Sequence, residues 1–79
     1  MAKVLGRYVV VDPAIHHGRI TFRGTRILVA DILEQVASGM AWEAIVDDWG
    51  GRIDKEAIAE AVRLSREALL AQEVEPSIE

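Results

Sequence analysis

Arg23-Gly24-Thr25-Arg26-Ile27 is the stretch that decides how this chain is organised. The residues before it are basic and rich in strand-forming types, while those after it are acidic and follow a helical pattern. A glycine at this point favours a tight turn, because glycine adopts positive φ angles without steric cost. We therefore expect Gly24 and Thr25 to form the turn that joins a β-arm at 1–28 to a helical body at 29–72.

Two short strands are predicted in the arm. The run from Tyr8 to Val11 is aromatic and β-branched and is closed by Asp12-Pro13, a typical strand followed by a turn. In the second strand apolar and polar residues alternate, so Ile20 and Phe22 share one face and should lie in a buried layer. The opposite face is either solvated or a ridge that contacts phosphates. It carries Arg19, Thr21 and Arg23.

Three helices are predicted after the joint, because apolar residues recur there at helical spacing. The first spans about Val29–Ser38 and stops at Gly39, and the second spans about 41–49 and stops at Gly50-Gly51. The third spans about Lys55–Gln72, with Asp54 as its N-cap. An acidic tail at 73–79 follows, and Pro76 ends any remaining helix.

The expected fold is therefore mainly α, a three-helix bundle preceded by a short two-stranded β-arm, in a single domain of residues 1–79. The tight Ser38-Gly39-Met40 turn between the first two helices is similar to the connections of helix-turn-helix domains. A chain of 79 residues buries a small core, and it has no cysteine with which to form a disulfide. We therefore expect a homodimer.

The two halves of the chain differ strongly in charge. Residues 1–28 carry five basic side chains against one acidic, a balance of +4, and residues 29–79 carry four basic against twelve acidic, a balance of −8. Such asymmetry suggests partners of opposite sign for the two ends. No apolar run approaches the length of a membrane span, and the first seven residues have too short an apolar core for a signal peptide. We expect a cytoplasmic protein with no membrane partner.

No residue pattern in the chain supports catalysis, a metal site or a cofactor. His16 and His17 are adjacent, and adjacent side chains on extended backbone point in opposite directions, so an exposed turn is the simpler interpretation. The serines lie outside any nucleophile-elbow motif. Trp42 and Trp49 are seven residues apart on one helix face, which favours a core role over base stacking.

Nucleic-acid binding is the class of function that the basic arm favours. The second helix exposes Glu43, Asp47 and Asp48, which would repel phosphates, so contacts should come from the arm and from one flank of the third helix. Arg23 is the stronger candidate contact, whereas Arg26 is expected to pair with Asp31. The candidate DNA-binding residues are Arg7, Arg19, Arg23 and Arg26, with Lys55, Arg63 and Arg66 secondary.

Several blocks of the sequence resemble the bacterial family catalogued as domain of unknown function 433. They are Asp12-Pro13-Ala14-Ile15, Arg23-Gly24-Thr25-Arg26-Ile27, Val29-Ala30-Asp31-Ile32-Leu33, Trp42-Glu43-Ala44-Ile45 and 54–62. The chain departs from the family pattern at a few positions. His17 replaces a glycine, Ile20 and Leu28 replace prolines, Ala41 replaces a serine N-cap, and Gly50-Gly51 replaces a turn that contains proline.

The resemblance implies a homeodomain-like helix-turn-helix fold with a small β-arm. It also implies an antitoxin of a type II toxin–antitoxin pair, in which a dimer binds operator DNA as a repressor and neutralises a PIN-like nuclease toxin. The alternative is a protein–protein interaction module that binds no DNA. In that case the arginines would pair with carboxylates of the protein itself or of a dimer mate.

Overall fold

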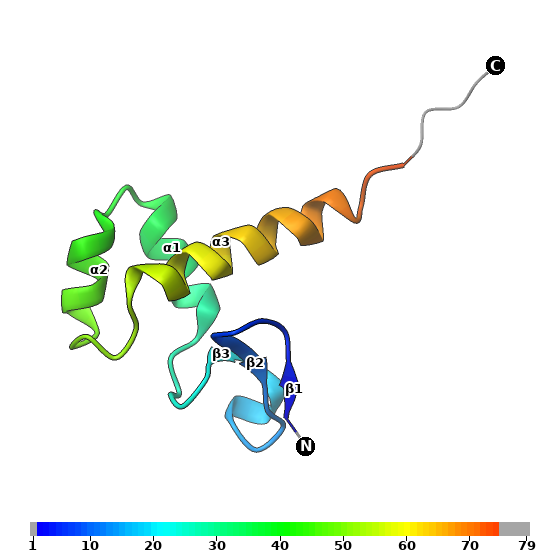
Figure 1. Cartoon of the computed structure of the whole chain (residues 1–79), viewed down its shortest axis with the longest axis horizontal. Coiled ribbons are helices and arrows are strands. Elements are labelled where there is room, and N and C mark those ends of the chain that lie inside the picture. Colours follow the sequence, from blue (N-terminus) through cyan, green and yellow to red (C-terminus); the bar gives the residue numbers. More distant parts are fainter. Residues whose placement is uncertain (1, 75–79) are drawn as a thin grey trace.

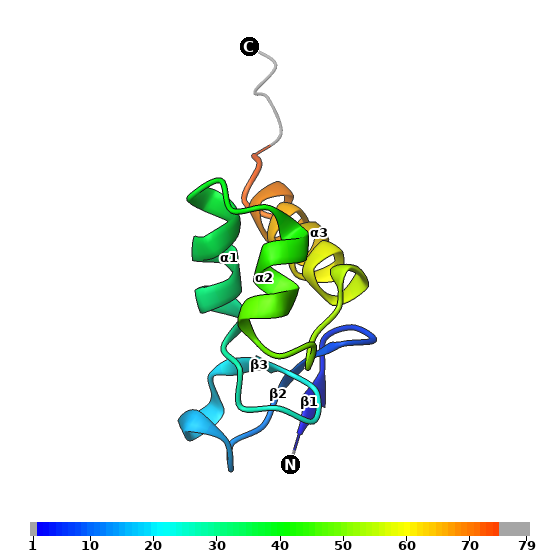
Figure 2. The same ribbon diagram turned by 90° about the vertical axis from the view of Figure 1, so that its left-hand side faces the viewer.

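The computed structural model describes residues 2–74, in which a small sheet lies at one end of three helices (Figures 1 and 2). The first helix, α1, starts beside the sheet, and α2 and α3 pack against it to form the helical body. The elements are β1 (Lys3–Val4), β2 (Val9–Val11), the 3-10 turn η1 (His16–Gly18), β3 (Ile20–Phe22), α1 (Val29–Ala37), α2 (Trp42–Asp48) and α3 (Lys55–Leu70). The three helices confirm the mainly α expectation.

The sheet has three antiparallel strands in the order β1-β2-β3, so the prediction of a two-stranded arm was wrong by one strand. The additional strand, β1, is only two residues long and pairs Val4 with Val10. Its turn is held because the N–H groups of Leu5 and Gly6 both donate to the Val9 carbonyl, at 2.9 and 3.1 Å. A strand of two residues is too short to show the alternation of apolar and polar residues by which strands are predicted from sequence.

The predicted turn at Gly24 and Thr25 is confirmed. Gly24 has a φ of 77°, and Thr25 Oγ1 donates to the Phe22 carbonyl at 2.8 Å and accepts from the Ile27 N–H at 3.0 Å. The Phe22 N–H in turn donates to the Ile27 carbonyl at 3.1 Å. One threonine hydroxyl therefore closes the loop that brings the chain from β3 into α1.

A single hydrophobic core joins the arm to the helices. Val9 and Phe22 of the sheet are each 2% exposed, and they cluster with Ile32, Ile45 and Ile58 from the three helices, each of which is fully buried. The predicted helix boundaries hold to within two residues. Asp54 caps α3 as expected, accepting the Ala57 N–H at 2.9 Å.

The expected burial of β3 was wrong at two of its three residues. Phe22 is buried, but Ile20 is 44% exposed and Thr21 is fully buried. Thr21 pairs with Val10 on one side and forms a β-bridge with Leu28 on the other, so the central residue of the expected polar face is buried while Arg19 and Arg23 are exposed. The polar ridge of Arg19, Thr21 and Arg23 therefore does not exist as a continuous surface.

The last turns of α3 extend beyond the other elements (Figure 1). Leu69 and Leu70 in this extension are 73% and 41% exposed. The predicted tail at 73–79 falls mostly outside the described residues, which include only its first two positions. Among residues 2–74, no helix combines the length and apolarity that a membrane span requires.

Candidate functional site

Three arginines line two hollows where the arm meets the α2–α3 connection, and a fourth, Arg7, lies against Tyr8 at the first of them. Arg23 and Arg52 line one hollow, together with Tyr8 and Asp54. Arg26 and the same Arg52 line a second hollow, with His16, Asp31 and Trp49 among its other walls. Arg52 is thus the member that links the two. We call Arg7, Arg23, Arg26 and Arg52 the basic surface.

Arg7 joins the basic surface through Tyr8. Its guanidinium carbon lies 5.4 Å from the centre of the Tyr8 ring, within the range of a cation–π contact. The Tyr8 hydroxyl donates to Glu56 Oε1 at 3.1 Å, which fixes the ring against α3. That hydrogen bond, followed by burial, raises the pKa of Tyr8 above its ordinary value.

The backbone of the arm is positioned by one carboxylate of α3. Glu60 accepts three main-chain N–H groups, from Arg7 at 2.9 Å, from Tyr8 at 2.7 Å and from Val9 at 3.0 Å. The N–H of Arg23 donates to the Tyr8 carbonyl at 2.7 Å, so the same turn also holds the end of β3. Arg7 and Arg23 are therefore presented from a backbone that is tied to the longest helix.

The arginines of the basic surface are exposed and have no acidic partner among the residues that the structure describes. Within residues 2–74, the one ion pair joins Lys55 Nζ to Glu43 Oε2 at 2.9 Å. No carboxylate oxygen there lies within 4.0 Å of a guanidinium nitrogen of Arg23 or Arg26. The predicted pairing of Arg26 with Asp31 is therefore wrong, although both residues line the same hollow. Unpaired guanidinium groups are available to bind phosphate oxygens.

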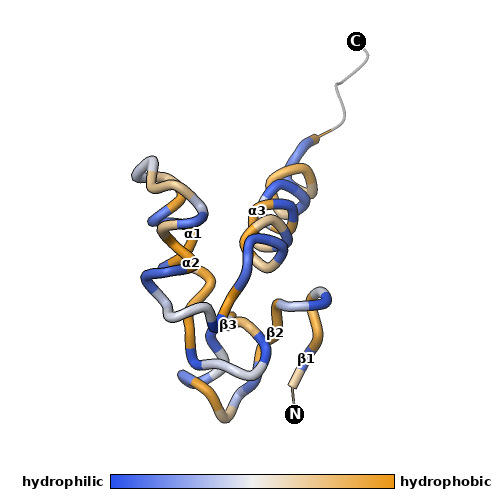
Figure 3. The backbone as a smooth tube through the Cα atoms, turned by 60° about the vertical axis from the view of Figure 1, so that its left-hand side comes forward, coloured by the Kyte–Doolittle hydropathy of each residue, from blue (hydrophilic) through white to orange (hydrophobic). Residues whose placement is uncertain are grey.

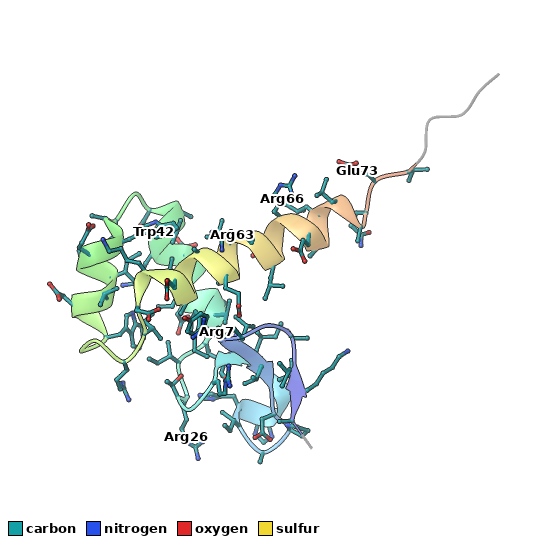
Figure 4. All side chains as sticks on the ribbon, in the orientation of Figure 1. Arg7, Arg26, Trp42, Arg63, Arg66 and Glu73 are labelled. Atoms are coloured by element: carbon teal, nitrogen blue, oxygen red, sulfur yellow. The ribbon has the colours of Figure 1, made fainter. Side chains whose placement is uncertain are left out.

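The remaining candidate residues lie elsewhere. Arg19 lines a hollow beside α1 with Ile20 and Leu33, apart from the basic surface. Lys55 is paired with Glu43, and the same hydrogen bond lowers the pKa of Glu43. Arg63 and Arg66 lie along α3 on the side turned away from the sheet, whereas Arg26 projects from the opposite end of the molecule (Figure 4). The structure thus separates the seven predicted residues into several groups.

Arg52 was absent from the predicted set, although it lies only three residues before the third helix. The signal that could have found it is the pair Gly50-Gly51, with φ angles of 66° and 73°. Two left-handed residues reverse the chain after α2 and return the next residue toward the arm. Sequence spacing alone gave no reason to place position 52 beside position 23 or 26.

The two histidines lie in an exposed turn, and the two tryptophans pack against the hydrophobic core. His16 and His17 lie exposed in η1 with φ angles of 50° and 58°, and a ring nitrogen of His16 lies 3.0 Å from the Arg26 carbonyl oxygen. Both tryptophans pack against the core. Trp49 Nε1 donates to Gln35 Oε1 at 2.7 Å, and its ring forms one wall of the hollow that contains Arg26 and Arg52.

Comparison with known proteins gives one match. A family model described as a protein of unknown function, DUF433, matches residues 9–64. The matched range begins in β2 and ends within α3, so it includes the turn at Gly24 and the position of Arg52. No curated protein and no solved structure matches the chain.

Proposed function

Because this chain belongs to the DUF433 family, we propose from its own surface chemistry that it is a small dimeric DNA-binding repressor, the antitoxin of a type II toxin–antitoxin pair. The observation that supports this most is the basic surface, on which four exposed arginines lie together and, within residues 2–74, have no ion-pair partner. Arginines in this state bind a phosphate backbone by displacing its counterions.

In this proposal the helices form a homeodomain-like helix-turn-helix domain, and the arm contributes most of the phosphate contacts. The N-terminus of α3 at Lys55 lies three residues after Arg52, where the helix dipole adds positive potential that the carboxylate of the N-cap Asp54 partly offsets. The outer side of α2 would face away from DNA, because it carries Glu43, Asp47 and Asp48. That acidic side is the candidate contact for a basic surface of the PIN-like nuclease that the family resemblance implies.

The alternative, an interaction module that binds no DNA, requires the arginines to be occupied by carboxylates. Arg23 and Arg26 have no such partner in the described part of the protomer. Arg26 also projects from the molecular surface (Figure 4). The exposed guanidinium groups favour DNA over the form of this alternative in which the protomer's own carboxylates pair with them, and leave pairing with a dimer mate as the form that competes with DNA binding.

The DNA part of the proposal is tested by titrating the protein against the DNA upstream of its own gene at several salt concentrations. We expect the double variant Arg23→Ala, Arg52→Ala to weaken binding about tenfold or more and to reduce the salt slope by roughly one for each lost phosphate contact. The matched control is Arg63→Ala, Arg66→Ala, which removes the same charge from the far side of α3. We expect the control to change the affinity less than threefold.

Three results would contradict the DNA part: binding independent of salt, equal losses in the two double variants, or no binding by the wild type. The antitoxin part is tested separately, by identifying the neighbouring reading frame and, where it encodes a PIN-like nuclease, co-expressing the two proteins. We expect growth to be restored by the wild type and not by a variant in which Glu43, Asp47 and Asp48 are changed to lysine. Rescue by that variant would contradict the assignment of the acidic side.

A further inference from the structure

An apolar groove with a volume of about 430 Å³ lies between α3, α1 and the sheet. We call it the apolar groove. The α3 wall runs from Ala61 to Ala68, and Ser65 and Glu67 are its only polar members. The other walls come from the arm, β3 and α1. They are Leu5, Val9, Ile20, Val29 and Leu33.

The α3 wall of the groove continues past the helical body. Hydrophobic residues recur along the whole of α3, including the turns that extend beyond the other elements (Figures 1 and 3). Leu69 lies one turn beyond Ser65 on this side of the helix and is 73% exposed. A short helical extension is marginal in water without packing. The extension and the groove together therefore present an apolar surface that lacks a covering partner in residues 2–74.

The composition of the groove favours a helix over a small molecule as its occupant. A site for a small polar ligand places several converging hydrogen-bonding groups in an apolar pocket. Here the lining offers one hydroxyl and one carboxylate on the same helix, and the Ser65 hydroxyl already donates to the Ala61 carbonyl at 2.8 Å. An elongated wall of leucine, isoleucine, valine and alanine instead fits the ridges of an amphipathic helix.

The charges beside the groove favour α3 of a second copy as that helix. Glu67 lines the groove from α3, and Arg19 lines the adjoining hollow, which shares Ile20, Val29 and Leu33 with the groove. Glu67 and Arg19 do not pair within the protomer. In a two-fold dimer every contact between the protomers occurs twice. A partner α3 lying along the groove would therefore bring the Glu67 of each protomer toward the Arg19 of the other.

We infer that the apolar groove is the self-association surface of this protein, in which the extended end of α3 from one protomer packs against β3, α1 and α3 of the other. This removes Arg19 from the DNA-contacting set and gives it a role between protomers. The inference rests on the dimeric state in the proposed function and not on DNA binding. Its test therefore contains no DNA, so that a failure of this inference can be distinguished from a failure of the DNA-binding proposal.

The test is sedimentation of the full chain over a range of concentrations, with circular dichroism to verify folding. The apolar variant is Ile20→Glu, in the groove, and its matched control is Val4→Glu, an exposed strand residue whose register with Val10 and Thr21 places it on the opposite face of the sheet. We expect a wild-type dimer, a dissociation constant raised about tenfold or more by Ile20→Glu, and a change below twofold for Val4→Glu.

The charge assignment is tested with reversals. We expect Arg19→Glu and Glu67→Arg each to weaken the dimer about threefold to tenfold, because each places two like-charge contacts in a two-fold interface. The double reversal should restore the wild-type dissociation constant to within about twofold. A monomeric wild type, equal effects of Ile20→Glu and Val4→Glu, or a double reversal weaker than both single reversals would overturn the inference.

Discussion

Glu60 and Gly6 fit together so closely that a β-carbon built on Gly6 would lie 2.5 Å from the Glu60 Oε1 atom. The same carboxylate accepts the N–H groups of Arg7, Tyr8 and Val9. A glycine is needed here for close approach and not for an unusual φ, since Gly6 is absent from the positive-φ glycines. This contact ties the β1–β2 turn, and with it the basic surface, to α3.

The first prediction follows from that contact. We expect Glu60→Ala to lower the free energy of unfolding by about 2 kcal/mol, because three N–H groups lose their acceptor. Gly6→Ala should cost a similar amount by displacing the carboxylate. In the Glu60→Ala background, however, Gly6→Ala should cost little, because the obstructing carboxylate is absent. Urea denaturation of the four proteins checks this cycle, and additive losses would contradict the close fit.

The second prediction concerns two threonines. Thr21 is fully buried, and its hydroxyl has no hydrogen-bond partner within residues 2–74, whereas the Thr25 hydroxyl donates to one backbone group and accepts from another. We expect Thr21→Val to raise the free energy of unfolding by about 1 kcal/mol, because an unsatisfied polar group is replaced by an apolar group of the same shape. The matched Thr25→Val should lower it by about 1–2 kcal/mol. Equal destabilisation by both in chemical denaturation would contradict the difference in their environments.

The third prediction concerns the helix caps. Ala41 precedes α2 and supplies no side-chain hydrogen bond, while Asp54 caps α3 through the Ala57 N–H. We expect Ala41→Ser to stabilise the protein by about 1 kcal/mol, and the control Asp54→Ala to destabilise it by about 1 kcal/mol. Thermal unfolding followed by circular dichroism measures both. A serine that leaves the stability unchanged would show that the first turn of α2 gains nothing from a cap.

The fourth prediction uses the only tyrosine in the chain, whose ionisation can be followed by ultraviolet absorbance without overlap from another phenol. The hydrogen bond to Glu56, followed by burial, raises the pKa of Tyr8 above 10.0. Tyr8 therefore contributes stability that is fully present below its unfolded pKa and is lost as the pH rises through the folded pKa. We expect Glu56→Ala to lower the pKa of Tyr8 toward 10.0, and Glu67→Ala to leave it unchanged. An identical titration in all three proteins would contradict the contact.

The sequence by itself determined the local structure. Helical periodicity, the glycines that end α1 and α2, and the capping Asp54 are all properties of neighbouring residues, so they could be read within a few positions of each helix end. The turn at Gly24 and Thr25 could be predicted for the same reason. It was expected to join the arm to the helices, and it lies between β3 and α1.

Tertiary structure alone decided which side chains of the arm are buried and which arginines lie together. Period-two alternation assumes one solvated face, and that assumption failed at Thr21, which is buried and has Val10 paired on one side and Leu28 bridged on the other. Arg52 lies with Arg23 and Arg26 only because Glu60 holds the arm against α3 and two glycines reverse the chain after α2. These contacts join residues more than 25 positions apart, a distance over which sequence periodicity carries no information.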